Sequence, residues 1–280
     1  MRLRIATCRP LPEPDVDEDL LLAALQAAGI DARMAAWHVP AEWLDAVPTV
    51  VRSTWDYIHD TRAFAQWVRA AAAGAPLWNP PQTLLGNLHK SYLLTLADRG
   101  VPTTPTMLLG RGSTPDLRRL CGARGWRDVV IKPAVGAASY ETHRLDASTE
   151  AAMQLAARLL ATHDLLVQPY LRSVEEHGER ALVWIDGEFT HAVRKTPRFA
   201  GGVESVSEAV PISAAERALG EAALAVAGDS DLLYARVDVA PAADGLPVVM
   251  ELELVEPSLF LLQHPPALQR LVDGIVRRLR

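Results

Sequence analysis

Two glutamates, Glu251 and Glu253, stand in the otherwise apolar stretch VVMELELVEPSLF at residues 248–260. Residues two apart in a β-strand point to the same face, so we expect the two carboxylates side by side. On a buried strand such a pair costs several kcal/mol through desolvation and like-charge repulsion unless a positive group lies between them. The spacing therefore predicts a bound cation or a basic partner at this strand.

A third carboxylate belongs to the preceding predicted strand, where Arg236 and Asp238 share one face of YARVDV. A turn through Asp244 and Gly245 follows, so the two strands are expected to form a hairpin with Asp238 opposite or diagonal to Glu251. The charged face of the second strand is predicted to comprise Val249, Glu251, Glu253 and Val255.

Three carboxylates on one hairpin suit a hard divalent cation. Mg²⁺ takes oxygen ligands from a few carboxylates and fills its remaining positions with water and nucleotide phosphates, so such a site implies a phosphate-bearing ligand. The hairpin alone is equally consistent with an exposed face of alternating charges, or with an Arg–Glu pair that neutralises itself. Residues elsewhere in the chain must decide between these interpretations.

Two lysines are candidates for contacts with a phosphate. Lys132 ends the apolar strand DVVIK and precedes PAVGAAS, a loop of small residues whose backbone amides could approach an anion closely. Lys90 lies in NLHKSYLL, within a helix predicted from about Thr83 to Arg99. The chain has neither the P-loop nor the Rossmann glycine pattern. Either lysine taken singly is more often a solvated surface residue.

The elements that would position these residues alternate between strands and helices. In the first part of the chain, strands are expected at LRIATC, DARMAAW and PTVVRST, and helices at 17–30 and 61–74. This alternation predicts an N-terminal α/β domain over residues 1–85 with a mainly parallel sheet.

The second part of the chain has a different pattern. The strand DVVIK is followed by a helix that Ser148 or Thr149 caps, and then by the strand LLVQPYL. ERALVWIDGEFTHAVRK is predicted to form a hairpin that turns at Asp186 and Gly187. Further helices are expected at 213–227 and over the C-terminal PPALQRLVDGIVRRLR.

Composition excludes several classes of protein. The chain has 280 residues with 34 acidic and 28 basic side chains and no Lys/Arg block, which argues against a nucleic-acid or membrane partner. Cys8 and Cys121 stand far apart, so neither a disulfide framework nor a zinc site is indicated. The N-terminus lacks the apolar run of a signal sequence, and no transmembrane-length apolar segment follows. We expect a soluble, cytoplasmic protein that acts on small molecules.

The order of Lys90, VVIKP, VQPYL, GER, RVD and MELE resembles the ATP-grasp superfamily, which includes D-alanine–D-alanine ligase and glutathione synthetase. The resemblance implies an α/β ATP-grasp fold in which two α+β lobes clasp ATP. These would be a small lobe with its connecting helix at 86–170 and a C-terminal lobe with the metal and catalytic site at 171–280. Within the superfamily, LHKSYLLTLADRGVPTTPT, HAVRK and MELELVEPSL look most like the cyclo-ligases that close O-ureido-D-serine to D-cycloserine.

The resemblance also implies roles for individual residues. Those that would bind ATP are Lys90 and Lys132 at its phosphates, the backbone around Gln168 and Leu171 at the adenine edge, and Glu179 at the ribose hydroxyls. Those that would bind Mg²⁺ are Asp238, Glu251 and Glu253, although many relatives have Asn at the position of Glu253. Arg236 would stabilise the developing oxyanion, and Lys195 would neutralise the transferring phosphate.

Substrate residues are less well defined. The segment VVRSTWDYIHD leaves a strand at its carboxyl end, where open α/β sheets place ligands, so Arg52 and Trp55 are candidates. A packing turn with Asp56 as a helix cap explains the same segment equally well. The other substrate candidates are Glu256, Ser258 and Arg198, the last in TPRFAGGVE, a loop expected to close over ATP.

The expected activity is an ATP- and Mg²⁺-dependent ligation in which a small, amino-acid-like carboxylate becomes an acylphosphate that an amine attacks. The amine belongs either to a second molecule or to the same one, as in a cyclo-ligase. A nucleotide-binding kinase and a non-catalytic ATP-binding module are alternatives from other classes. Ligases of this kind often form homodimers.

Overall fold

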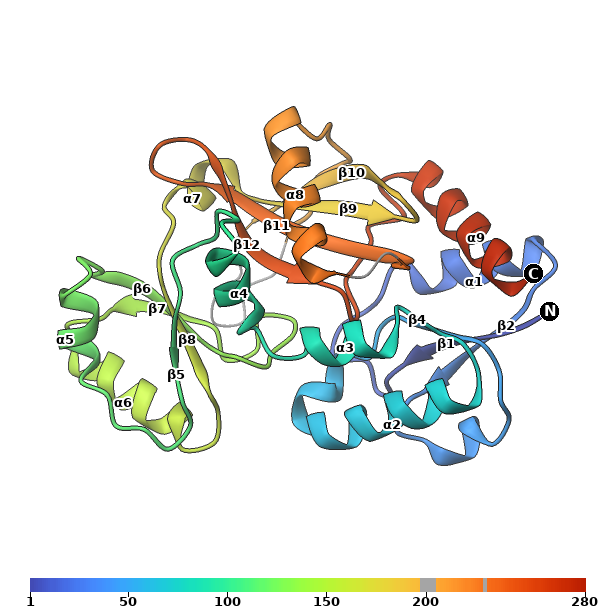
Figure 1. Cartoon of the computed structure of the whole chain (residues 1–280), viewed down its shortest axis with the longest axis horizontal. Helices are drawn as coiled ribbons and strands as arrows, with labels where there is room; N and C mark the ends of the chain where they lie inside the picture. The colour runs from blue at the N-terminus through green and yellow to red at the C-terminus, as the bar shows by residue number, and fades with distance from the viewer. Residues whose placement is uncertain (197–204, 229–230) are drawn as a thin grey trace.

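The computed structural model of the chain describes residues 1–196, 205–228 and 231–280, and within them it contains three four-stranded sheets (Figure 1). The N-terminal sheet has the order β2 (Asp31–Ala36), β1 (Arg2–Thr7), β3 (Thr49–Val51), β4 (Leu77–Trp78), and all its pairs are parallel. Its helices are α1 (Glu18–Ala27) and α2 (Thr61–Gly74), with short 3₁₀ helices η1 (Pro40–Trp43) and η2 (Trp55–His59). The predicted parallel α/β layer is therefore confirmed.

The central sheet has the order β5 (Met107–Leu109), β8 (Leu165–Pro169), β6 (Asp128–Pro133), β7 (His143–Asp146), with antiparallel pairs throughout. Helices α5 (Leu117–Gly122) and α6 (Glu150–Leu160) pack on it and complete an apolar core. Thr149 caps α6, since its hydroxyl accepts a hydrogen bond from the backbone N–H of Ala152 at 3.2 Å.

The third sheet has the order β10 (Glu188–Lys195), β9 (Glu179–Ile185), β11 (Tyr234–Pro241), β12 (Pro247–Glu253), again with antiparallel pairs. Its helices are α7 (Ser173–His177), α8 (Ala214–Ala227) and α9 (Pro265–Leu279). The predicted turn between β9 and β10 is confirmed: Asp186 and Gly187 have φ values of 46° and 101°, which the two-residue hairpin turn requires.

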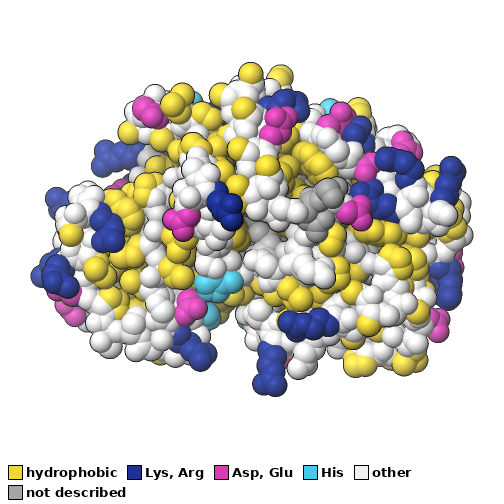
Figure 2. All heavy atoms as spheres, viewed as in Figure 1, with side chains coloured by type: hydrophobic (Ala, Val, Ile, Leu, Met, Phe, Trp, Pro, Cys, Tyr) yellow, Lys and Arg dark blue, Asp and Glu magenta, His cyan; other side chains and the backbone are white. Residues whose placement is uncertain are grey.

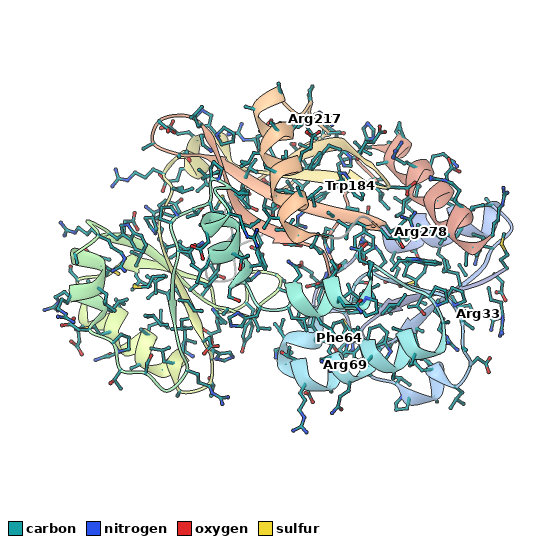
Figure 3. The ribbon with its side chains drawn as sticks, in the orientation of Figure 1. Arg33, Phe64, Arg69, Trp184, Arg217 and Arg278 are labelled. Carbon is teal, nitrogen blue, oxygen red and sulfur yellow. The ribbon has the colours of Figure 1, made fainter. Side chains whose placement is uncertain are left out.

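The C-terminal helix α9 returns to the N-terminal domain, so both ends of the chain lie on one side of the molecule (Figure 1). Leu21 and Leu25 of α1 share one buried cluster with Leu271 and Ile275 of α9. Arg278 of α9 (Figure 3) bonds the Asp186 carboxylate at 2.7 Å and the Leu232 carbonyl at 3.1 Å. The C-terminal helix therefore joins the N-terminal domain to the third sheet. Among the described residues, no helix has both the length and the apolarity that crossing a bilayer requires.

The single helix predicted from Thr83 to Arg99 is wrong. The structure has two helices, α3 (Pro81–Asn87) and α4 (Tyr92–Asp98), and Lys90 lies in the turn between them. The Lys90 N–H donates to the carbonyl of Ala134 at 2.7 Å instead of to a carbonyl within the helix. In the same turn, Nδ1 of His89 accepts from the Ser91 N–H at 3.2 Å. These bonds interrupt the helix and fix Lys90 beside the small-residue loop.

The predicted face of β12 is also wrong at two positions: Val255 lies beyond the end of the strand, and Val249 leaves the charged face. Asp238 pairs with Glu251 as expected, but a β-bulge follows, and Val239 then pairs with Val249. Met250 is the extra residue of the bulge. Val249 consequently joins the apolar core with Leu252, while Met250 lines the same cavity as Glu251.

His191 on β10 makes stability sensitive to pH. Its ring stacks on that of His264, with centroids 4.7 Å apart, and burial, followed by the charge of His264, lowers its pKa from 6.5 to about 4. Between these values the unfolded chain binds a proton that the native chain does not, so stability falls as pH falls from 6.5 toward 4. We expect a loss of about 2 to 3 kcal/mol at the lower end.

Urea unfolding of wild type and His191→Phe at several pH values measures this contribution. The variant should lose part of the acid-side decline in unfolding free energy, whereas the same change at the exposed His177 should not. Identical pH slopes for wild type and His191→Phe would show that His191 titrates in the same way in both states.

Candidate active site

A cavity lies between the central and third sheets, and the N-terminal domain closes it at one end. β6, β8 and the loop after β6 form one side, the third sheet forms the other, and η2 closes one end. Most predicted site residues line it: Lys90, Lys132, Gln168, Leu171, Glu179, Lys195, Arg236, Asp238, Glu251, Glu253, Trp55, Glu256 and Ser258. Tertiary structure thus gathers residues spread over two hundred positions of the sequence.

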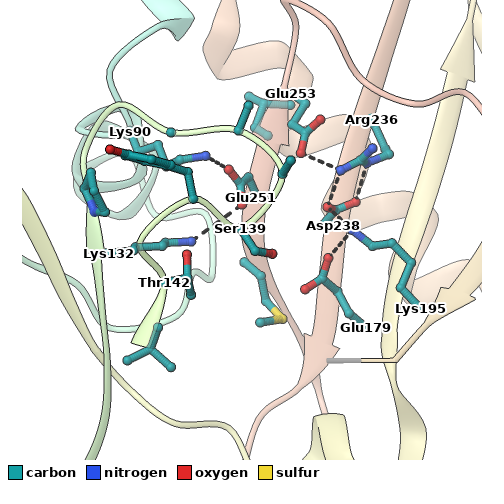
Figure 4. A pocket seen from close by; sticks show the side chains of 18 of the residues that line it. Lys90, Lys132, Ser139, Thr142, Glu179, Lys195, Arg236, Asp238, Glu251 and Glu253 are labelled. Atoms are coloured by element: carbon teal, nitrogen blue, oxygen red, sulfur yellow. Dashed lines mark hydrogen bonds and ion pairs between the residues drawn. The ribbon is translucent and has the colours of Figure 1, made fainter. Parts of the chain in front are cut away.

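The two lysines converge on one carboxylate (Figure 4). Lys132 Nζ lies 3.5 Å from Glu251 Oε2, and Lys90 forms an ion pair with the other oxygen of the same side chain. Burial lowers the pKa of both lysines, and for Lys132 burial and the neighbouring charge of Lys90 bring it to about 8. Two desolvated cations that share one counter-ion form a strong site for an anion such as a phosphate.

A second charge network surrounds Asp238 on β11. Arg236 binds it with two hydrogen bonds of 2.9 Å, and Lys195 Nζ donates to it at 2.8 Å. Burial by itself would raise the pKa of Asp238, but Arg236 and Lys195 outweigh burial and hold it well below its usual range. The Asp238 carboxylate is therefore ionised and fixed in place.

Two further acids extend this network. Glu179 is the cross-strand partner of Lys195 and pairs with it at 2.5 Å, while burial raises the pKa of Glu179. Glu253 lies opposite Arg236 and forms an ion pair with it. Arg236 thus contacts two of the three carboxylates that are predicted as metal ligands, and its positive charge balances theirs.

The donor set fits a hard divalent cation. Asp238, Glu251 and Glu253 offer only carboxylate oxygens, and all three face the cavity from adjacent strands. Within the described part of the chain, no three His, Cys, Asp or Glu side chains are already gathered as a metal site, because each of these carboxylates faces a lysine or arginine. Binding a metal here requires the basic side chains to turn toward another anion.

The end of strand β8 and the residues after it continue the side of the cavity that the central sheet forms. Gln168 pairs with Val130 of β6, and its side chain donates to the hydroxyl of Thr106 at 2.9 Å, so it is held on both sides. Tyr170, Leu171 and Val174 continue the wall. Met250, the extra residue of the bulge in β12, also lines the cavity and was not predicted to reach it.

The small-residue loop after β6 covers the lysines. Ala138, Ser139 and Glu141 have positive φ values of 48°, 57° and 47°, an unusual density of left-handed non-glycine residues, and such strain collects at functional sites. The ring of Tyr140 packs edge-on against His59 of η2, with centroids 5.5 Å apart. The surface is hollowed between the central and N-terminal parts of the molecule, and histidine side chains gather there (Figure 2).

The far end of the cavity holds the substrate candidates. Trp55, Glu256 and Ser258 line it, together with Glu13 and Tyr57, which sequence reasoning missed. Burial, followed by the charge of Glu253, raises the pKa of Glu256 to about 8. Isolated acids and aromatics carry no spacing signal, so only proximity in the fold identifies the missed pair.

Arg52 lies elsewhere than expected. It is only 3% exposed, does not line the cavity and donates to the carbonyl of Pro257 at 2.8 Å, so in this structure the chain's own backbone occupies its guanidinium. The helix cap assigned to Asp56 is wrong. Asp60 caps α2 by accepting from the Ala63 N–H at 2.9 Å, while Asp56 accepts from Nε1 of Trp37. Arg198 and the glycines of its loop lie outside the described residues.

Comparison with known proteins agrees with this geometry. A family model described as the N-terminal domain of D-cycloserine synthetase DcsG matches residues 3–79. The cycloserine biosynthesis protein DcsG of Streptomyces lavendulae is 32% identical over 283 residues, which cover 95% of both chains. The crystal structure of D-cycloserine synthetase DcsG superposes over the whole of both chains with a TM-score of 0.92 and 32% identity.

A more distant structure shows the same fold. The ATP-grasp ligase PsnB, solved with a phosphomimetic precursor variant, Mg and ADP, has a TM-score of 0.66 and 19% identity, covering 99% of this chain and 98% of its own. The family resemblance and the ATP-grasp fold expected from the sequence are thereby confirmed. The chain belongs to the DcsG family of ATP-grasp proteins and is an ATP-dependent carboxylate–amine ligase.

Proposed function

We propose that this enzyme is a cyclo-ligase, which joins the carboxylate of an amino-acid-derived substrate to a nitrogen of the same molecule. The observation that carries this proposal is the match to D-cycloserine synthetase over the entire chain, including the N-terminal domain that supplies Trp55 and Tyr57 to the substrate end. A relative that shared only the ATP-binding lobes would support nucleotide binding and no particular substrate.

ATP is proposed to lie between the central and third sheets. Lys90 and Lys132 would exchange Glu251 for phosphate oxygens, the backbone at Gln168 and Leu171 would meet the adenine, and Glu179 would meet the ribose. This exchange replaces one counter-ion by another, so both lysines remain neutralised. It also releases Glu251.

The released carboxylate completes the set for Mg²⁺, with Asp238, Glu251 and Glu253 as the proposed ligands. A magnesium ion held there would neutralise phosphate oxygens and favour transfer of the γ-phosphoryl group. Lys195, fixed between Glu179 and Asp238, would add positive charge beside the same group.

The protein's part in the reaction is positioning and charge stabilisation. The substrate carboxylate oxygen attacks the γ-phosphorus as the bond to ADP breaks, and the resulting acylphosphate has a good leaving group. The substrate nitrogen then attacks the acyl carbon, phosphate leaves and the nitrogen loses a proton. Arg236 is proposed to stabilise the oxyanion that forms during this attack. Trp55, Glu256 and Ser258 are proposed to orient the substrate.

Incubation with ATP, Mg²⁺ and O-ureido-D-serine tests this function. We expect D-cycloserine to form together with ADP and phosphate, the carbamoyl group of the ureido substituent being lost with water as CO₂ and ammonia, at a rate well above that of ATP hydrolysis without substrate. Mass spectrometry identifies the product, and a coupled assay follows ADP.

Other outcomes identify the alternatives. ADP release that needs a second, amine-bearing molecule from an amino-acid pool would indicate an intermolecular ligase, and a stable phosphorylated product would indicate a kinase. ATP binding without turnover across such a screen would indicate a non-catalytic module.

A further inference from the structure

Residues 254–258, which directly follow the proposed metal ligand Glu253, form a buried segment without regular secondary structure. We call them the 254–258 segment. Glu256 and Ser258 lie within it, so its path decides where both side chains enter the cavity. A buried irregular segment has no neighbouring strand to satisfy its carbonyl groups, which must find other donors.

Each of its five consecutive carbonyls accepts a hydrogen bond from a different side chain. The donors are Asn79 to Leu254 at 2.8 Å, Tyr234 to Val255 at 2.9 Å, Trp55 to Glu256 at 3.0 Å, Arg52 to Pro257 at 2.8 Å, and Arg236 to Ser258 at 3.3 Å. The five donors are at most 7% exposed. Side chains therefore replace a sheet ladder along this segment.

Three of these donors belong to the N-terminal domain, at the carboxyl ends of β3 and β4. Arg52 and Trp55 follow β3, and Asn79 follows β4. The hydroxyl of Tyr234 also lies 2.6 Å from the carbonyl of Val51 in β3, so its single proton is shared between the Val51 and Val255 carbonyls. Residues at the edge of the N-terminal sheet thus hold the backbone of the 254–258 segment, which carries the substrate candidates Glu256 and Ser258.

Arg52 and Arg236 are the two charged donors of the five, and Arg52 makes the shorter contact, 2.8 Å against 3.3 Å. Its guanidinium is charged and 3% exposed, its Nη1 meets a carbonyl, and it lies over the ring of Tyr234 at 5.6 Å from the centroid. Hydrogen bonds from charged donors contribute more than neutral ones, and loss of this donor would leave the Pro257 carbonyl without the partner it has here. Arg52, a substrate candidate from the sequence, therefore contacts the backbone that carries Glu256 and Ser258.

We propose that Arg52 and Trp55 are positioning residues of the substrate end, which fix Glu256 and Ser258 through the carbonyls of Pro257 and Glu256. The identity of the substrate in this inference rests on the proposed function. The link from Arg52 and Trp55 to the backbone of Glu256 and Ser258 rests on the hydrogen bonds alone. A displacement of about 1 Å at a reacting group can lower the rate about a hundredfold. Residues that only hold the backbone in place can therefore have a large effect on the kinetics.

The test compares Arg52→Met, Arg52→Lys and Trp55→Phe with wild type, using O-ureido-D-serine and ATP. We expect Arg52→Met to raise KM for O-ureido-D-serine by about tenfold or more while the Kd for ATP stays within about twofold. Arg52→Lys should recover part of the loss, since its ammonium can still donate toward Pro257. Trp55→Phe keeps the aromatic wall and removes one donor, so its KM should rise by a smaller factor.

Arg62→Met is the matched control, because it removes an exposed arginine from the same domain. Hydrogen exchange of peptides that cover 254–262 gives a readout independent of substrate. It should accelerate in Arg52→Met, and not in Arg62→Met, while peptides around Lys132 remain unchanged.

An Arg52→Met enzyme with wild-type KM overturns the proposal, and so does a parallel loss of ATP affinity, which would show general destabilisation. If the wild type does not convert O-ureido-D-serine, the proposed function fails and the exchange data decide the inference. Equal exchange at 254–262 in both variants then overturns it.

Discussion

Replacing Glu251 and Glu253 together by glutamine is expected to lower kcat/KM by about a thousandfold, or about 4 kcal/mol of transition-state stabilisation. Amide oxygens are weaker ligands for Mg²⁺ than carboxylates, so two of the three proposed ligands lose most of their strength. The apparent KM for Mg²⁺ should rise as well, which distinguishes loss of the metal from damage elsewhere. Steady-state ADP release at several Mg²⁺ concentrations measures both quantities.

The same substitution has a second consequence in the absence of ATP. Lys90 and Lys132 share Glu251 as counter-ion, so glutamine leaves two buried cations facing each other without it. We expect a lower thermal midpoint for the ligand-free variant and a disproportionately large increase on addition of ATP. Glu221→Gln, at an exposed position on α8, is the control and should leave both properties unchanged. Full turnover by the double variant would refute the assignment of the metal ligands.

Replacing Arg236 by methionine is expected to lower kcat by about a hundredfold to a thousandfold with little change in the affinity for ATP. The guanidinium is buried, ionised and held by Asp238 with two bonds, so its charge is already oriented before the reaction begins. Arg236→Lys should retain charge but lose the two-pronged geometry, and we expect it to recover only part of the rate.

Kinetics with saturating ATP and varied substrate, together with ATP binding measured by calorimetry, separate these effects. Arg236 also donates to Ser258, so a rise in substrate KM alone would indicate that it supports the substrate end and does not stabilise the oxyanion. Asp238 keeps Lys195 as a partner when Arg236 is removed, so we expect the variant to fold. Circular dichroism checks this.

Local chemistry explains the elements that were predicted well. Asp186 and Gly187 turn the β9–β10 hairpin because their backbone needs positive φ, and Thr149 caps α6 with its own hydroxyl. β4 and β5 are too short to show periodicity and were not located, whereas the equally short β3 lies within the predicted strand PTVVRST. The turn residues predicted Asp238 opposite or diagonal to Glu251, and the register of the folded hairpin places them opposite each other.

The sequence by itself indicated the class of ligand. Two glutamates at strand spacing, an aspartate on the partner strand, a lysine at the end of an apolar strand and another in a predicted helix favour phosphate and a hard cation once their order resembles the ATP-grasp pattern. These properties depend on residue types and on neighbours within a few positions, and the sequence states both directly.

Only the tertiary structure decided which side chains reach the reacting groups. Arg52 is withdrawn from the substrate because it bonds the carbonyl of Pro257, which lies 205 residues later in the chain. Lys90 lies in a turn and not in the predicted helix because its N–H donates to the carbonyl of Ala134. Met250 lines the cavity because β12 contains a β-bulge at this residue. For Arg52 and Lys90 the bonding partner is distant in sequence, and for Met250 the register of two paired strands decides. Such partners and registers are established only when the chain has folded.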